Sequence, residues 1–432
     1  MLHPEPTQGD TKWFVHDRFG MFIHWGTYSA AARHEWVRNH EKTPMEQYQK
    51  YFDHFSPDLY EPREWARTAR EAGMKYFVIT TKHHEGFCLW DTRYTAYKAP
   101  NTPIGRDLLT PMVDAFRAEG LRVGFYYSLI DWHHPEFPID GIHPLRDHPD
   151  AIEMNKTRDV TKYAEYMRNQ VTELLTQFGQ VDILWFDFSY PGSEYRGMKG
   201  KGHDDWESEE LLALVRKLQP GIIVDNRLDL PNAMADIHTP EQWQPHKWVH
   251  VDGKPVVWEA CQTFSGSWGY YRDEQTWKSP EQLVQMLINS VSLGGNLLMN
   301  VGPTARGTFD YRAVAALGAY RDWMRLHRRS IEGCTQSEFT APSDCRYTQN
   351  GSRLYVHIYA WPFRHLHLPG LANRVDYAQL LNDGSEVQFR NSSGDENGHG
   401  GKEATHLTLE LPVQRPGVTV PVIELFLKEP AG

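Results

Sequence analysis

A short apolar stretch of the chain ends at a single carboxylate. Residues 181–186, Val-Asp-Ile-Leu-Trp-Phe, have the length and composition of a fully buried strand, and Asp187 follows them directly. An ionisable group at the end of a buried strand is costly unless it is paired or used. In a barrel of parallel strands, the strand ends are where catalytic residues lie. Asp187 is therefore a candidate catalytic residue, and the alternative is a residue that caps the next segment.

Polar side chains also end the other strand-like stretches of the chain. One such residue could be a cap or a satisfied core group, but a polar group at every strand end is hard to explain by structure alone. We therefore predict one shared active site at this end of a sheet. The candidates are, in chain order, His24; His83, His84 and Glu85; Tyr126 and Tyr127; Asn226 and Arg227; Glu241; Glu259; and Asn300.

These residue types favour one reaction class over several others. Adjacent histidines such as His83 and His84 point to opposite faces of an extended strand, which argues against a metal site. A glycine-rich phosphate loop, a GxSxG elbow and a recognisable Cys-His pair are all missing from the sequence. What remains is a pair of carboxylates in an aromatic, histidine-rich pocket. Two carboxylates across a sugar bond are the minimum equipment for glycoside hydrolysis.

Strand-like and helix-like segments alternate from residue 19 to about residue 329, which predicts an α/β fold. Eight strands with intervening helices match a (β/α)8 TIM-like barrel. The sixth strand is weak, and the helix between the fifth and sixth strands is missing or very short, so we expect an irregular barrel there. The expected strands cover 19–25, 75–81, 121–127, 181–186, 221–225, 235–239, 255–260 and 296–301, and the expected helices cover 62–72, 107–119, 155–178, 208–218, 280–293 and 311–328.

The pattern changes after about residue 335. Short stretches of alternating apolar and polar residues, separated by turn residues, predict a C-terminal antiparallel β-sandwich. We expect a catalytic barrel over residues 1–333, a sandwich over residues 334–432, and a mobile loop over the Gly-, Ser- and Asp-rich residues 391–402. The expected sandwich strands cover 353–359, 387–389, 404–411 and 422–426.

Charge and cysteine usage exclude some classes of protein. The 432 residues carry a net charge of −11, which argues against a nucleic-acid partner or a basic membrane-surface protein. No apolar stretch approaches the roughly 18 residues needed to span a bilayer. Cys334 and Cys345 could pair, but the sequence leaves this open. The first residues lack the basic and apolar regions of a signal peptide, so we expect a cytoplasmic protein with reduced thiols.

Several strings of the chain resemble the α-L-fucosidases of glycoside hydrolase family 29. The resemblance spans about residues 12 to 330, with the strings in family order. It rests on residues 20–26 (GMFIHWG), 81–90 (TKHHEGFCLW), 124–128 (GFYYS), 184–187 (LWFD), 258–261 (WEAC), 267–270 (SWGY) and 294–303 (GGNLLMNVGP).

The resemblance implies a retaining exo-α-L-fucosidase that needs no cofactor and no metal and acts through a covalent fucosyl-enzyme. The family nucleophile, at the end of the fourth strand, falls on Asp187. The general acid/base falls on Glu241, in the string Thr239-Pro240-Glu241, and its rival is Glu259. Members of the family often associate, so a homo-oligomer is a further expectation. The substrate-binding positions of the family fall on His24, Glu35, Trp36, His83, His84, Tyr126, Trp185, Arg227 and Trp268.

The chain departs from the family pattern at two places. Phe188 and Ser189 follow the nucleophile position where many relatives have glycine, so the backbone beside the sugar is expected to differ. The string before Arg227 reads Asp225-Asn226 rather than Asn-Asp. Two alternatives stay open: another retaining exo-glycosidase on the same barrel, and a barrel protein that binds sugar without cleaving it.

The chemistry of L-fucose agrees with the transferred residues. Fucose carries a methyl group at C5, which suits tryptophan and phenylalanine side chains, and hydroxyls, which suit imidazoles and Glu35. Asp187 must be ionised to attack the anomeric carbon. Glu241 must begin protonated, which a site closed off from water would favour.

Overall fold

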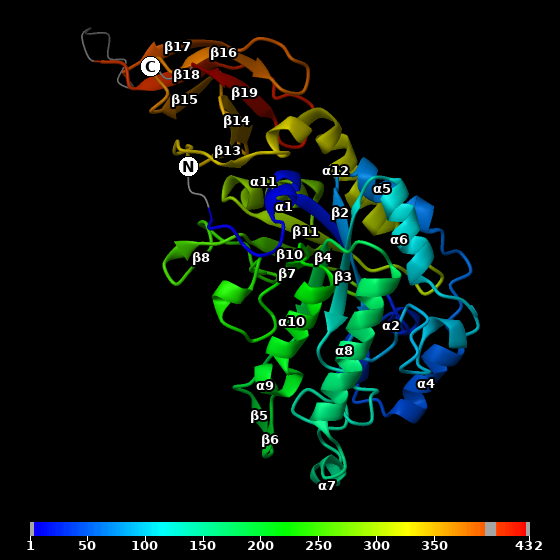
Figure 1. Ribbon diagram of the computed structural model, residues 1–432. Helices are drawn as coiled ribbons and strands as arrows, with labels where there is room; N and C mark the ends of the chain where they lie inside the picture. The colour runs from blue at the N-terminus through cyan, green and yellow to red at the C-terminus, as the bar shows by residue number, and fades with distance from the viewer. Residues whose placement is uncertain (1–3, 394–402, 429–432) are drawn as a thin grey trace.

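The computed structural model describes residues 4–393 and 403–428, and its largest element is a parallel sheet (Figure 1). Seven strands lie in the spatial order β10-β11-β1-β2-β3-β4-β7. All residues of β1, β2, β10 and β11 are buried, as expected for parallel strands covered on both faces. The bounds are β1 Phe19–Ile23, β2 Tyr76–Lys82, β3 Arg122–Ser128, β4 Ile183–Asp187, β7 Ile223–Val224, β10 Glu259–Thr263 and β11 Asn296–Val301.

Isolated bridges, rather than a regular strand, close the sheet into a barrel between β7 and β10. Asp225 pairs with Ile237, and His238 pairs with Trp258, both in parallel. The predicted sixth strand is thus reduced to two residues. A single 3-10 turn, η2 (Asn232–Met234), stands where a helix would connect strands five and six. The TIM-like barrel and its irregular sixth unit are both confirmed.

The seventh strand lies further along the chain than predicted. Its expected range, 255–260, includes the end of a small hairpin, β8 (His250–Val251) and β9 (Lys254–Pro255), and β10 begins only at Glu259. Glu259 pairs with Asn296, the first residue of β11, so it lies at the amino end of its strand. The prediction that Glu259 ends the strand is wrong, because the strand begins at this residue and pairs with β11 as far as Thr263.

The helices of the barrel begin and end within a few residues of the predicted bounds, apart from the third. Glu61 accepts a hydrogen bond from Arg63 N, and Ser279 and Gln282 form a reciprocal capping box, so both helices start where the caps dictate. The helix predicted over 155–178 begins only at Val160, where Asp159 caps it, and Asn155 is the last residue of a separate short helix. The main helices are α5 Pro62–Glu71, α6 Leu109–Ala118, α8 Val160–Gln177, α10 Ser208–Leu218, α11 Pro280–Ser292 and α12 Tyr311–His327, and shorter ones are α1 Lys12–Asp17, α2 Tyr28–Ala31, α3 Val37–His40, α4 Met45–Asp53, α7 Ala151–Asn155 and α9 His203–Trp206.

The C-terminal part consists of two antiparallel sheets, as the sandwich prediction requires. They have the orders β12-β13-β14-β19-β16 and β15-β18-β17, and a separate cluster of buried apolar side chains lies among them. Of the predicted loop 391–402, Asn391 and Ser392 belong to β17, and residues 394–402 lie outside the described residues. The strands are β12 Thr335–Gln336, β13 Cys345–Asn350, β14 Arg353–Ile358, β15 His365–Pro369, β16 Val375–Leu380, β17 Gln388–Ser392, β18 His406–Glu410 and β19 Val422–Leu427.

These sheets pack on the barrel at the end opposite to the carboxyl ends of its strands. In Figure 1 the arrowhead of β3 points away from them. Trp323 of α12 donates to the Val420 carbonyl at 3.0 Å, and Arg18, just before β1, donates to the Cys334 carbonyl at 2.8 Å. Cys334 and Cys345 are free and buried, so the possible disulfide does not form. The sandwich therefore leaves the carboxyl end of the barrel uncovered.

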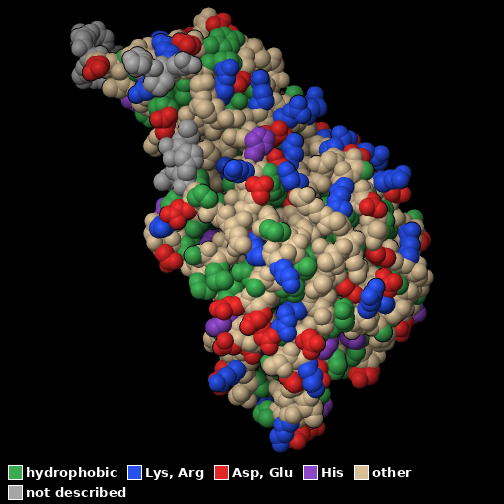
Figure 2. All heavy atoms as spheres, in the orientation of Figure 1, with side chains coloured by type: hydrophobic (Ala, Val, Ile, Leu, Met, Phe, Trp, Pro, Cys, Tyr) green, Lys and Arg blue, Asp and Glu red, His purple; other side chains and the backbone are tan. Residues whose placement is uncertain are grey.

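Acidic and basic side chains are interspersed over the face of the molecule that Figure 2 shows. Within residues 4–393 and 403–428, none of the helices has the length and apolar character that crossing a bilayer requires.

Candidate active site

A pocket of about 350 Å³ opens at the carboxyl ends of the barrel strands. It brings together both carboxylates favoured by the sequence and eight of the nine predicted binding residues. Arg227, the ninth, does not line the pocket wall but bonds to the two carboxylates. The lining consists of Phe22, His24, Glu35, Trp36, His83, His84, Tyr126, Trp185, Asp187, Phe188, Glu241, Cys261 and Trp268.

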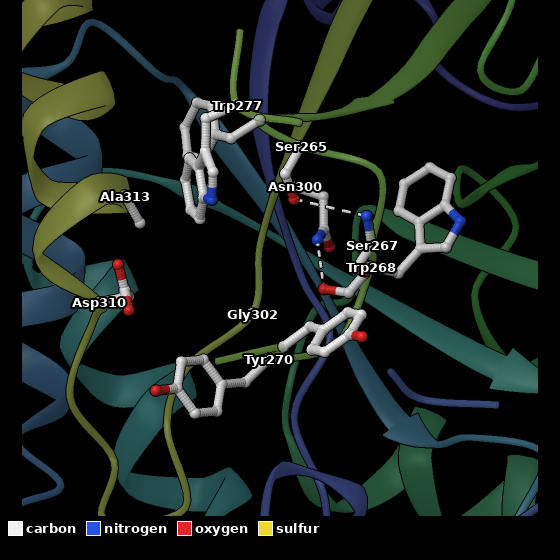
Figure 3. Close-up of a pocket in the computed structure, with 12 residues that line it drawn as sticks. Ser265, Ser267, Trp268, Tyr270, Trp277, Asn300, Gly302, Asp310 and Ala313 are labelled. Atoms are coloured by element: carbon white, nitrogen blue, oxygen red, sulfur yellow. Dashed lines mark hydrogen bonds between the residues drawn. The ribbon is translucent and has the colours of Figure 1, made fainter. Parts of the chain in front are cut away.

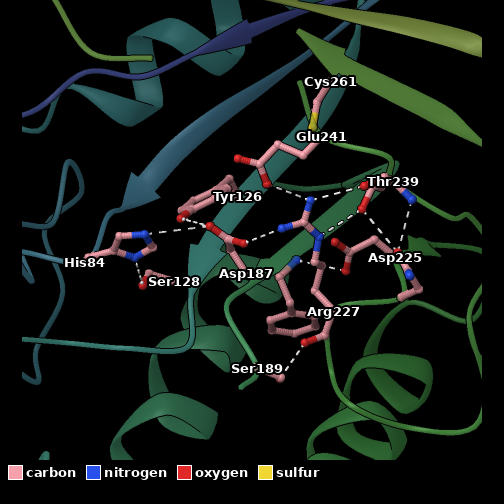
Figure 4. A network of polar contacts seen from close by, with 12 residues as sticks. His84, Tyr126, Ser128, Asp187, Ser189, Asp225, Arg227, Thr239, Glu241 and Cys261 are labelled. Atoms are coloured by element: carbon pink, nitrogen blue, oxygen red, sulfur yellow. Dashed lines mark hydrogen bonds and ion pairs between the residues drawn. The ribbon is translucent and has the colours of Figure 1, made fainter. Parts of the chain in front are cut away.

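Asp187 is held from three sides (Figure 4). It is the last residue of β4, and Tyr126 donates its hydroxyl to Asp187 Oδ2 at 2.7 Å. Arg227 Nη1 donates to Asp187 Oδ1 at 2.9 Å, and His84 Nε2 lies 3.8 Å from Oδ2. Burial raises the pKa of Asp187 to about 6, and Glu241 adds to the rise while Arg227 and Tyr126 oppose it. The carboxylate is thus ionised at neutral pH and fixed in position.

Arg227 joins the two carboxylates. Its Nη2 donates to Glu241 Oε2 at 2.9 Å, while its Nε donates to Thr239 Oγ1 at 3.0 Å. The Glu241 side chain is 42% exposed, so in this structure it is not closed off from water as the sequence argument expected. The reason is its place after the reduced sixth strand, where a lone bridge to Cys261 replaces a regular ladder. Arg227 thus bonds to Oε2 of Glu241 and to Oδ1 of Asp187 at the same time.

Glu259, the rival acid/base, lies at the other end of the barrel. It is fully buried and accepts a hydrogen bond from the Tyr76 hydroxyl at the start of β2. Burial raises the pKa of Glu259 to about 8. Glu259 is absent from the pocket lining, because β10 begins at this residue and its carboxyl end is four residues further on.

The pocket histidines are neutral, and the tautomer of His24 follows from its partner. Burial lowers the pKa of His24 to about 3, and it holds the pKa values of His83 and His84 well below the usual range. Asn300 Oδ1 lies 2.6 Å from His24 Nδ1, and the Asn300 amide donates to the Trp268 carbonyl at 2.6 Å, which fixes the amide orientation. His24 Nδ1 therefore donates, and His24 Nε2 is left as a hydrogen-bond acceptor.

The opposite wall joins Glu35 to the segment that carries Trp268. Gly269 N donates to Glu35 Oε2 at 2.7 Å, and burial raises the pKa of Glu35 to about 7. His83 Nδ1 and Glu35 Oε1 are buried and make no hydrogen bond within the described part of the chain, although Glu35 Oε1 lies 3.2 Å from His34 Nδ1. Such atoms need a partner from outside the chain, and a ligand hydroxyl or a water would supply it.

A second hollow of about 330 Å³ is also lined by Trp268, together with Tyr270, Trp277 and Asp310 (Figure 3).

Sequence reasoning missed three lining residues. Phe22 lies two residues before His24, on the same face of extended chain, so the period of two offered a signal. Cys261 is the third residue of β10, two residues beyond Glu259 towards the carboxyl end, and would have been found with correct strand bounds. Phe188 departs from the family pattern, but its place on the pocket wall depends on a backbone conformation that the sequence does not reveal.

The arrangement suits acid-base and nucleophilic work on a neutral, hydroxyl-rich ligand. Two carboxylates share one guanidinium, neutral imidazoles offer donors and acceptors, and aromatic rings cover the rest. Phe22 packs against Trp185 and Trp268 with ring centroids 5.3 and 5.8 Å apart, which forms an apolar corner. Among the residues that the structure describes, no cluster of three or more His, Cys, Asp or Glu side chains is placed to hold a metal ion.

Comparison with known proteins identifies the family. The family model described as alpha-L-fucosidase matches residues 5–329. Human plasma alpha-L-fucosidase is 29% identical over 388 residues, covering 81% of this chain and 76% of that protein. The structure of alpha-L-fucosidase isoenzyme 1 from Paenibacillus thiaminolyticus is 45% identical, with a TM-score of 0.90 over 97% of this chain and 99% of that one.

A further solved structure bears on the chemistry. It is a GH29 alpha-L-fucosidase from Bacteroides thetaiotaomicron, described as a trapped covalent intermediate with 2-fluoro-fucosyl fluoride. It is 26% identical, with a TM-score of 0.83 over 99% of this chain and 98% of that one. The chain belongs to the α-L-fucosidase family of glycoside hydrolases.

Proposed function

We propose that this protein removes terminal α-L-fucose by double displacement, with Asp187 as nucleophile and Glu241 as general acid/base. The observation that carries the proposal is the guanidinium of Arg227, which bonds to both carboxylates at the pocket. Asp187 attacks the anomeric carbon, and the bond to the leaving oxygen breaks as Glu241 gives that oxygen its proton. The product of this step is a fucosyl ester of Asp187 and a free alcohol.

The second step reverses the roles. Glu241, now ionised, takes a proton from a water molecule, and the water oxygen attacks the anomeric carbon of the ester. The bond to Asp187 breaks, Glu241 is protonated again, and fucose leaves with its original anomeric configuration. The covalent intermediate described for the Bacteroides enzyme supports this route for a relative of the same fold.

The shape of the pocket supports removal of a terminal sugar. Its floor is closed by buried aromatic side chains of the barrel interior, including Phe22, Tyr126 and Trp185. The hydroxyls of fucose would bond to Glu35 and the neutral histidines, and the methyl group would lie against the apolar corner of Phe22, Trp185 and Trp268. Because the floor is closed, the rest of the substrate must leave through the mouth, where Glu241 lies.

Substrate selection tests the proposal. We expect hydrolysis of an aryl α-L-fucoside, and cleavage of the matching α-L-galactoside reduced about 10²-fold, because an apolar pocket rejects one added hydroxyl only weakly. A β-D-fucoside presents its hydroxyls in mirror-image arrangement, so the polar groups cannot all pair, and it should be nearly inert. The measurement is kcat/KM on the three glycosides. Equal values for the L-fucoside and the D-fucoside would refute the substrate class, and binding of fucose without turnover would favour a sugar-binding protein.

The pH profile should report the ionisation of Asp187. Since only the charged carboxylate attacks, kcat/KM should fall below a pH of about 6, which is the pKa that burial gives Asp187. Tyr126→Phe removes a hydrogen bond that stabilises the charged form, so it should raise this pKa and move the acid limb to higher pH. Tyr127→Phe is the matched control, because its hydroxyl bonds to Gln170 at 2.8 Å instead. If the acid limb of the kcat/KM profile lies at the same pH in Tyr126→Phe as in the parent, a group other than Asp187 is titrating.

Two expectations, the location of the protein in the cell and its oligomeric state, stay predictions. A cytoplasmic location rests on the sequence alone, and so does association into a homo-oligomer. Light scattering coupled to size-exclusion chromatography would measure the mass in solution.

A further inference from the structure

Phe188 has an unusual backbone conformation for a bulky residue. It follows Asp187 directly, and its φ is +85°, in the left-handed region that favours glycine. For residues with a large side chain this region is strained. Strained residues persist only where the surrounding structure fixes them, and they cluster at functional sites. The strain beside a catalytic carboxylate therefore calls for a reason.

The two residues after Phe188 are each fixed to a different part of the barrel. Ser189 Oγ donates to the carbonyl of Arg227 at 2.7 Å, and Trp206 Nε1 donates to Ser189 Oγ at 3.1 Å. The Tyr190 hydroxyl donates to Asp140 Oδ2 at 2.5 Å, and Asp140 forms a buried ion pair with Lys201. These contacts hold the segment in place and so maintain the strained conformation of Phe188.

The conformation places the Phe188 ring on the pocket wall. Its centroid lies 5.2 Å from that of His84, 5.4 Å from that of Trp36 and 5.3 Å from that of Tyr190. His84 is buried in the pocket floor at 1% exposure, whereas Phe188 and Tyr190 are half-buried. The rings of His84, Phe188 and Tyr190 thus form a row that leads from the floor of the pocket towards solvent.

The mouth of the pocket is where the leaving group must lie. The partly exposed lining residues are Trp36, Asp187, Phe188, Glu241 and Trp268, and Glu241 must reach the glycosidic oxygen at that level. The face of a phenylalanine ring offers nothing to a hydroxyl but packs well against the C–H face of a sugar or an aryl ring. A ring at this place therefore contacts the group joined to the fucose rather than the fucose itself.

We propose that Phe188, supported by Tyr190, determines specificity by packing against the group that is joined to fucose. The inference rests on the proposed hydrolysis of α-L-fucosides and adds the residue that recognises the leaving group, a sugar or aryl ring with an apolar face. The strained backbone is the means by which the ring reaches that position.

The test compares substrates with and without a ring in the leaving group. Phe188→Gly and Phe188→Ala should lower kcat/KM on a fucosylated disaccharide and an aryl fucoside by about threefold to tenfold. On α-L-fucosyl fluoride, whose leaving group has no ring, both variants should stay within about twofold of the parent. The inhibition constant of free L-fucose should not change, because fucose occupies only the floor. Equal losses on all three substrates, no loss on any of them, or weaker inhibition by fucose would each overturn the proposal.

Controls separate the ring from the backbone strain. The quantity to compare is the ratio of kcat/KM on the ring-bearing substrates to kcat/KM on fucosyl fluoride. Phe188→Tyr keeps the ring and should keep this substrate ratio. Arg364→Gly relieves a similar strain, at φ +66°, on the exposed surface of the sandwich and should leave the ratio unchanged. Phe188→Gly should melt at a higher temperature than Phe188→Ala, since both lack the ring and only glycine suits the conformation. If both unfold, Phe188→Leu keeps the bulk without the flat face and serves the same comparison. A parent enzyme inactive on every fucoside would refute the proposed function instead.

Discussion

Replacing Asp187 by glycine is expected to leave a folded protein whose turnover of an aryl α-L-fucoside is at least about 10³-fold lower, a loss of about 4 kcal/mol of transition-state stabilisation. The reason is that no other carboxylate of the pocket lies at the end of β4, bonded to both Tyr126 and Arg227. Glu241, the second carboxylate, stands on the other side of Arg227. The fold should survive, because burial makes a charge at this place costly and its removal relieves that cost.

Azide gives this prediction its specific readout. A small anion can enter the space vacated by the side chain, so azide should restore part of the rate in Asp187→Gly and yield the β-L-fucosyl azide. Asp187→Asn is the matched control, because the amide fills the same space and should block the rescue while it abolishes activity. Turnover of either variant within about tenfold of the parent would remove Asp187 from the role of nucleophile.

Replacing Glu241 by alanine is expected to have an effect that depends on the leaving group. A fucosylated disaccharide has a poor leaving group that needs a proton, so its kcat/KM should fall about 10² to 10⁴-fold. Fucosyl fluoride needs little protonation and should lose far less in its first step. Azide should accelerate the second step and give the α-L-fucosyl azide, the opposite anomer to that expected from Asp187→Gly. The two azide products together assign both carboxylates.

Glu259→Gln is the control that decides between the two glutamates. The pKa of about 8 that burial gives Glu259 keeps it protonated at neutral pH, so an amide of the same shape replaces it closely. We expect activity within about threefold of the parent and at most a small change in melting temperature. A leaving-group-dependent loss in Glu259→Gln, with none in Glu241→Ala, would reverse the assignment.

The sequence predicted the barrel best where its strands are apolar and its helices carry caps. Residues 183–187 could be recognised because a buried parallel strand is a continuous apolar run, and the strand end then identified Asp187. The strand Glu259–Thr263 was predicted too early in the chain. Its residues, Glu-Ala-Cys-Gln-Thr, include polar side chains that are buried in the barrel, whereas the apolar residues before it do not belong to the strand. Local composition cannot distinguish a barrel strand with polar side chains from an apolar segment that precedes it, since burial is set by the neighbouring strands.

The candidate site was predictable to the extent that it depends on strand ends. His24, Tyr126 and Asp187 follow from the order of the elements, and their meeting follows from the closure of the barrel. The sharing of Arg227 between two carboxylates, the exposure of Glu241 and the strained backbone of Phe188 do not. Each depends on how irregular segments after β4 and β7 are held by contacts distant in sequence, such as the bridge from Glu241 to Cys261.

The four buried thiols give the molecule a set of built-in reporters. Burial raises the pKa values of Cys88, Cys334 and Cys345 to about 12, and it raises the pKa of Cys261 well above its usual value. Because the thiolate is the form that reacts with alkylating agents, the native fold should be almost inert to iodoacetamide. Labelling of each cysteine then requires a local opening. Cys261 lies in the pocket wall, Cys334 at the junction and Cys345 in the sandwich, so the order of labelling under mild denaturant would reveal which part of the enzyme loosens first.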